Sequence, residues 1–152
     1  MGQDYEPSKR SFKSIQLLKT DNKLTISWGF MLTEESKKQI IEGFVRLIDH
    51  ISDKDYQKRI WIRGEGPEVD DFDETVCNFS PAADGIIEKY KDFGLTELQY
   101  QLLKKFRDQF RVFYDENDWP EHFIETPEWV KIMNLAKEVL KAFNYQKERK
   151  YL

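Results

Sequence analysis

Apolar residues three and four positions apart recur in five stretches of this chain, and this spacing constrains the fold more than any other feature. Such spacing places the apolar side chains on one face of an α-helix. Local start signals support three of the stretches. Thr33 can cap a helix of about 18 residues, the stretch from Thr96 opens with a capping box, and Thr126 precedes a proline suited to a first helical turn. We therefore expect four or five amphipathic helices.

The two middle helices are predicted from the same spacing together with proline and glycine. Pro67 suits the first position of a helix over 67–79, and the pair Ser80–Pro81 ends this helix and begins another. Gly94 is typical of the residue that follows a helix end. The predicted apolar faces are Val69, Phe72, Val76 and Phe79 in the first helix, and Ile86, Ile87, Tyr90 and Phe93 in the second.

Two other regions favour strands. Apolar and polar residues alternate on both sides of Asp21–Asn22, which predicts a β-hairpin near 14–28. The run 59–63 is short, β-branched and aromatic, and a glycine follows it, so it predicts a third strand. The expected fold is therefore α+β, with a small antiparallel sheet packed by four or five helices. The alternative is a mainly α-helical bundle to which the hairpin is an accessory.

Length and composition place these elements in one domain. The chain has 152 residues, 39% of them hydrophobic and 14% aromatic, which is enough for one core. A single cysteine excludes an internal disulfide, and no apolar run reaches the roughly 20 residues that span a bilayer. We expect a flexible tail over 1–13, one globular domain over 14–145 and a frayed tail over 146–152, in a soluble cytoplasmic protein that does not bind membranes.

Charge is distributed unevenly along the chain. Residues 64–128 carry 17 acidic and 6 basic side chains, while the regions on both sides are mildly basic. Nucleic-acid binding requires a concentrated basic surface, so this function class is not expected. An acidic middle region instead fits a basic partner, a cation or internal charge pairing.

The most distinctive motif consists of six carboxylates within residues 65–74, with no basic residue among them. A second feature is a tryptophan with a nearby phenylalanine in the polar loop 115–123. This tryptophan is of interest because an exposed tryptophan beside acids commonly anchors a protein partner. Together these features predict a partner-binding surface. Its residues are Glu65, Glu68, Asp70, Asp71, Asp73, Glu74, Trp119 and Phe123.

Plainer interpretations of both features stay open. Acidic residues are favoured in the first turns of any helix, and those of 65–74 could pair with a basic stripe further along the chain. That stripe consists of Lys104, Arg107 and Arg111. Trp119 could fold back to cover a helix end instead of contacting a partner.

Patterns for catalysis and metal binding are weak. The residues His50, His122 and Cys77 do not have the spacing of a zinc motif, and no segment has the oxygen ligands of a calcium loop. Nearby carboxylates would raise the pKa of the Cys77 thiol, which disfavours a nucleophilic thiolate. Gly64 and Gly66 lack the third glycine of a dinucleotide-binding loop. The sequence therefore assigns no catalytic residue, metal ligand or cofactor.

The leading hypothesis for function is an acidic protein-interaction module, of the adaptor or inhibitor and immunity type, that engages a protein with a basic surface. One alternative is an enzyme that uses carboxylates, with or without Mg²⁺ or Mn²⁺. A second alternative is a self-associating structural protein, because the apolar face predicted over 96–113 is wider than a surface helix needs and could pair two copies in a homodimer.

Overall fold

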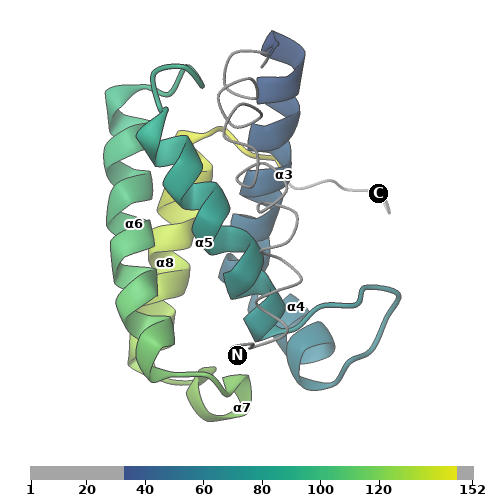
Figure 1. Ribbon diagram of the computed structural model, residues 1–152. Coiled ribbons are helices and arrows are strands. Elements are labelled where there is room, and N and C mark those ends of the chain that lie inside the picture. Colours follow the sequence, from purple (N-terminus) through teal and green to yellow (C-terminus); the bar gives the residue numbers. More distant parts are fainter. Residues whose placement is uncertain (1–32, 147–152) are drawn as a thin grey trace, which may run out of the picture.

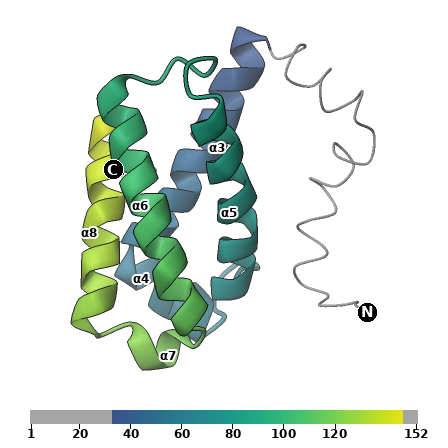
Figure 2. The same ribbon diagram turned by 60° about the vertical axis from the view of Figure 1, so that its left-hand side comes forward.

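The computed structural model describes residues 33–146, and these form an up-and-down bundle of four long helices (Figure 1). The long helices are α3 (Glu34–Ser52), α5 (Phe72–Glu88), α6 (Glu97–Glu116) and α8 (Pro127–Ala142). Helix α8 packs against both α3 and α6, and α5 packs against α6 and α3 to close the bundle (Figure 2). Shorter elements are α4 (Lys54–Tyr56), the π-helix η1 (Gln57–Ile62) and α7 (Pro120–Phe123).

The predicted α+β fold is wrong, because the part of the chain that the structure describes is helical and holds no strand. There the alternative, a mainly helical bundle, is correct. The hairpin predicted near 14–28 lies outside the described residues. The strand predicted over 59–63 falls instead on η1, where the amide of Arg63 donates to the carbonyl of Lys58 at 3.1 Å, five residues back.

Burial explains why this segment is helical. Gln57, Ile60 and Trp61 are all buried, and they are spaced three and one residues apart, as on one face of a helix. Because one buried residue of that face, Gln57, is polar, the pattern of apolar residues alone does not predict a helix here. Gln57 is fully buried: its Nε2 donates to the carbonyls of His50 and Ile51, at 3.0 and 2.9 Å, and its Oε1 accepts from the indole of Trp129 at 2.9 Å. These bonds join the end of α3 to η1 and α8.

Three helix starts are confirmed. The side chain of Thr33 accepts a hydrogen bond from the amide of Ser36 and caps α3. Thr96 and Gln99 form the reciprocal capping box at the start of α6, and Thr126 caps α8 with a proline directly after it. In each case the sequence predicts the start because the capping side chain and its backbone partner lie within three residues of each other.

The start of α5 differs from its prediction. The helix begins at Phe72, because the side chain of Asp71 accepts from the amide of Glu74 at 2.7 Å and caps it there. Pro67 therefore lies in a loop before the helix. Val69, predicted to belong to the buried face, is 97% exposed.

The break predicted at Ser80–Pro81 is also wrong, because Pro81 lies inside a continuous α5. A proline in a helix interior removes one hydrogen bond and costs about 3 kcal/mol. Phe79 and Ala83, on either side of it, are fully buried, and their packing holds the helix together. Gly94 does adopt a positive φ of 75°, but it lies in the turn between α5 and α6 rather than directly after a helix.

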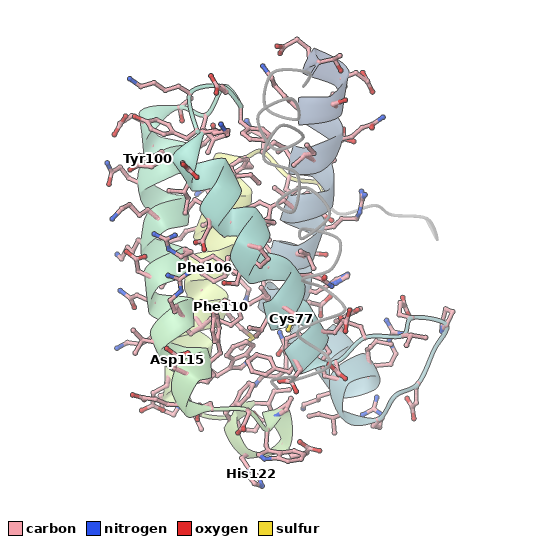
Figure 3. The ribbon with its side chains drawn as sticks, viewed as in Figure 1. Cys77, Tyr100, Phe106, Phe110, Asp115 and His122 are labelled. Carbon is pink, nitrogen blue, oxygen red and sulfur yellow. The ribbon has the colours of Figure 1, made fainter. Side chains whose placement is uncertain are left out.

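Aromatic rings fill the core of the bundle. Phe106 and Phe110 of α6 lie between α6 and α5 and are fully buried (Figure 3). Their ring centroids lie 5.4 and 5.3 Å from that of Phe79. Trp129 of α8, also fully buried, lies 4.8 Å from the ring of Phe123. Edge-to-face and tilted pairs of this kind stabilise a core beyond the area that they bury. Over residues 33–146, no helix has the length and apolar character needed to cross a membrane.

Candidate functional site

The loop that joins η1 to α5, residues 63–71, is here named the tethered loop. Its backbone turns at Gly64 and Gly66, whose φ angles are 64° and 101°. A Cβ on Gly66 would lie 2.6 Å from a guanidinium nitrogen of Arg59 and 3.3 Å from Ile60, so the loop lies close against η1. The amide of Glu65 donates to the carbonyl of Arg59 at 2.8 Å, which fixes the first half of the loop.

Two predicted site residues of the tethered loop pair with cations of their own chain. Glu65 lies 3.0 Å from Arg63, and Glu68 lies 3.3 Å from Arg59. A hydrogen bond from its own backbone amide, together with Arg59, lowers the pKa of the Glu68 carboxyl. Both acids are therefore partly neutralised within the molecule.

Asp70 is the principal tether of this loop. One of its oxygens accepts from the hydroxyl of Tyr56 at 2.9 Å and from the indole nitrogen of Trp61 at 3.2 Å, and both accept from the hydroxyl of Thr75 at 3.1 Å. All three donors belong to buried residues. Burial and the hydrogen bond to Asp70 raise the pKa of Tyr56. Asp70 thus joins the loop to α4, η1 and α5, and its carboxylate is largely used inside the molecule.

The remaining acids of the motif lie on α5. Asp71 caps the helix and Glu74 is half-buried in its first turn. Asp73 is exposed, and in the described part of the chain it accepts no hydrogen bond and forms no ion pair. Partial burial, and then the nearby charges of Asp71 and Asp118, raise the pKa of the Asp73 carboxyl. The structure therefore brings Asp73 close to an acid 45 positions further along the chain.

Asp118 lies in the connection between α6 and α7, and Trp119 follows it directly. The side chain of Trp119 is 61% exposed, although Pro120 beside it is buried. Phe123, by contrast, is 2% exposed and lies in the core, with its ring 4.9 Å from that of Phe72. Of the two aromatic residues predicted for the partner surface, only Trp119 is at the surface.

The contact of Phe72 with Phe123 also explains how the start of α5 comes to lie beside α7. Asp73, Asp118 and Trp119 lie at this end of the bundle, and we name these three residues the acidic end. Asp115 lies at the same end, at the close of α6 (Figure 3). Residues 112–130 contain five further carboxylates besides Asp118 and no lysine or arginine.

The basic stripe does not pair with the 65–74 acids. Arg107 and Arg111 of α6 both contact Asp84 of α5, at 2.6 and 3.0 Å, and Lys104 lies 3.7 Å from Asp108. Hydrogen bonds to Asp108 and Asp84 raise the pKa of Arg107 despite the opposing effect of burial. The stripe therefore joins α6 to α5 and leaves the acidic end without a cation from this helix.

No convergent group of metal ligands is found in the residues that the structure describes: none of their His, Cys, Asp and Glu side chains gather in threes as an ion would require. Cys77 on α5 and His122 at the end of α7 lie far apart (Figure 3). The acids of 65–74 diverge into the loop, the helix cap and the acidic end. These acids therefore do not converge on one point among residues 33–146.

The apolar face of α6 is used inside the bundle. Leu103, Phe106, Phe110 and Phe113 are buried in the core. Leu98 and Val112 remain exposed, at 63% and 61%, but 14 positions of helix separate them by about 21 Å. Most of the wide apolar face that suggested a homodimer is thus buried in the core of the chain itself.

Sequence reasoning missed two features of this site. One is Asp118, although the lack of lysine and arginine in the sequence around it could have indicated an uncompensated acid. The other is the internal role of Asp70, whose donors lie 14, 9 and 5 positions away and carry no local signature. Comparison with protein-family models finds no match for this chain, and the same result holds for the curated proteins and for the solved structures.

Proposed function

We propose that this chain is a protein-interaction module that binds a partner with a basic surface through the acidic end. The observation that carries the proposal is the pair Asp73 and Asp118. Partial burial and the negative charges of Asp71 and Asp118 raise the pKa of the Asp73 carboxyl, and within the described structure neither Asp73 nor Asp118 has a cation or a hydrogen-bond donor. A lysine or arginine of a partner beside these carboxylates would offset the repulsion.

Trp119 supports the proposal through its position. Buried Pro120 and the hydrogen bond from the amide of His122 to the carbonyl of Trp119, at 2.8 Å, fix its backbone. Its side chain is largely exposed, so it offers a large apolar surface whose backbone loses little entropy on binding. Tryptophan and arginine are the residues that most often dominate binding energy in protein interfaces. An exposed tryptophan flanked by acids fits a basic partner that also presents an apolar pocket.

The test compares two double variants with the same change of charge. Asp73→Asn with Asp118→Asn removes the acids of the acidic end, and Glu65→Gln with Glu68→Gln removes two acids of the tethered loop. Immobilised wild type and variants are incubated with lysate at low salt, and captured proteins are quantified by mass spectrometry. We expect one partner to be reduced at least about tenfold by the first variant and unchanged by the second, a difference of about 1.4 kcal/mol in binding.

A further variant, Trp119→Ala, should reduce capture of the same partner, since an anchor of this kind contributes about 2 kcal/mol or more. Binding should also weaken as salt is raised. Circular dichroism of each variant establishes that it is folded. Equal capture by the two double variants, or the absence of any partner at low salt, would contradict the proposal.

A further inference from the structure

Three hydrogen-bond donors from α4, η1 and α5 converge on one carboxylate. They are the hydroxyl of Tyr56, the indole nitrogen of Trp61 and the hydroxyl of Thr75, which lie 2.9, 3.2 and 3.1 Å from the same oxygen of Asp70. We name these three donors the carboxylate cradle. All three belong to buried side chains, and hydrogen bonds to a charged acceptor are stronger than those between neutral groups.

Packing within the bundle holds the cradle in place independently of Asp70. The ring of Tyr56 stacks on that of His50, with centroids 3.9 Å apart, and meets the ring of Trp61 edge-on at 6.5 Å. Thr75 is fully buried on α5. These contacts do not involve the carboxylate, so we expect the donors to stay converged when it leaves. Donors that are already in position bind an anion with little loss of conformational entropy.

The tethered loop, by contrast, is held mainly through Asp70. Residues 63–69 are all exposed, so this part of the loop buries no apolar side chain. Within the described part of the chain, no hydrogen bond between backbone groups involves residues 66–70. The two ion pairs of the loop are exposed, and such pairs contribute little to stability. The loop therefore places one carboxylate in a preformed site and has few other attachments.

A second carboxylate of the loop binds a cation beside the cradle. Arg59 of η1 lies 3.3 Å from Glu68, and its guanidinium lies over the ring of Tyr56, 5.9 Å from the centroid. Glu68 and Asp70 are two residues apart, so a short acidic segment fills both the arginine and the cradle. A guanidinium next to convergent neutral donors suits carboxylates in particular.

We propose that Arg59 and the cradle form a binding site for an acidic peptide segment of another protein, and that the tethered loop closes this site as an autoinhibitory contact. The ligand has two carboxylates with the spacing of Glu68 and Asp70. It binds when the loop turns away at Gly64 and Gly66. Because Asp70 belongs to the same chain, it competes at a high effective concentration. This inference does not depend on the proposed function, which concerns a basic partner and the acidic end.

The test uses the full-length chain with Asp70→Ala, which removes the internal competitor. The probe is a synthetic peptide with the sequence of residues 64–71, and the control peptide carries Glu68→Gln and Asp70→Asn. Calorimetry measures affinity, and nuclear magnetic resonance follows the indole N–H of Trp61. We expect the variant to bind the probe at least about tenfold more tightly than wild type, with a shift of this N–H, and not to bind the control peptide. Asp73→Ala, which changes an acid outside the loop, should bind as wild type does.

Two further measurements keep the test decisive if Asp70→Ala is poorly folded. Asp70→Asn keeps an acceptor oxygen for the cradle but no charge, and it should fold and still bind the probe more tightly than wild type. Formate, the smallest carboxylate, should raise the unfolding temperature of Asp70→Ala by at least about 2 °C more than that of wild type or Asp73→Ala, relative to chloride at equal ionic strength.

Three results would overturn the proposal. One is equal binding of the probe by wild type and both Asp70 variants, which would show that the loop does not compete for the site. Another is binding without a shift of the Trp61 indole. The third is the same effect of formate on all three proteins, which would show that the cradle does not hold a free carboxylate.

Discussion

The tethered loop and the acidic end carry the same kind of charge, and Asp73 of the acidic end follows the loop by two residues, but their carboxylates have opposite roles. In the loop, Glu65 and Glu68 have cations of their own chain and Asp70 has three hydrogen-bond donors. At the acidic end, Asp73 lies near the negative charges of Asp71 and Asp118, and among the described residues neither Asp73 nor Asp118 has a cation to pair with. A run of acids in a sequence is therefore not a single surface. Here the division falls at Asp71, the cap of α5.

The difference arises from backbone geometry. Before the cap, the chain is irregular and folds against η1, so its acids lie close to the donors and cations of that element. After the cap, the backbone is helical, and Asp73 lies on the exposed side of α5. Each prediction below pairs a change in the tethered loop with a control change at the acidic end or elsewhere in α5, so each can break the comparison or sharpen it.

The largest effect is expected from Asp70→Ala. The change leaves the buried donors of Tyr56, Trp61 and Thr75 without their acceptor, and it should lower the free energy of unfolding by about 3 kcal/mol. The matched change Asp73→Asn should alter it by less than about 0.5 kcal/mol, because this side chain is exposed and has no partner among the described residues. Urea unfolding measures both. Similar losses for the two variants would show that the two regions do not differ in this way.

An intermediate effect is expected from Gly66→Ala in the tethered loop. Its φ of 101° is strained for any residue with a Cβ, and that atom would contact Arg59 and Ile60, so a loss of about 1–2 kcal/mol is expected. The matched change Gly85→Ala lies inside α5, where a new Cβ has no atom within 4 Å, and it should stabilise by about 0.5–1 kcal/mol. Thermal unfolding distinguishes the two signs. A neutral result at Gly66 would indicate a loop that is not held in this conformation.

Much of the bundle can be predicted from the sequence, because helix caps are local. Thr33, Thr96 and Thr126 each bind an amide three residues away, and each correctly predicts a start. The prediction fails where distant packing decides. Pro81 remains inside α5 because the surrounding core outweighs the cost of proline, and Gln57 is buried because Trp129, 72 positions away, needs an acceptor.

The same distinction applies to the candidate site. The sequence reveals which residues are acidic and that Trp119 lies in a polar loop. It does not reveal that Phe123 belongs to the core or that Asp118 lies beside Asp73, because both follow from the contact of α7 with the start of α5. The number of charged residues can therefore be read from the sequence. Whether each charge has an opposite charge or a hydrogen-bond donor beside it depends on the residues that the fold places next to it.

The smallest effect, and the most direct test of the comparison, is the pH dependence of stability. The pKa of Asp73 is raised in the folded protein, so its negative charge opposes folding. This loss of stability is absent below the unfolded pKa near 4, where the carboxyl is protonated in both states. It is complete above the folded pKa, where the carboxyl is charged in both states. Asp73→Asn should therefore be more stable than wild type by about 0.3 kcal/mol at neutral pH and equal to it near pH 3.

The pKa of Glu68 is lowered, so its charge favours folding, and that contribution is lost as the pH falls through the folded pKa. Glu68→Gln should therefore be less stable than wild type at neutral pH, with the difference vanishing in acid. Urea unfolding from pH 3 to 7 measures both differences, and the same sign for the two variants would refute the contrast between the acidic end and the tethered loop.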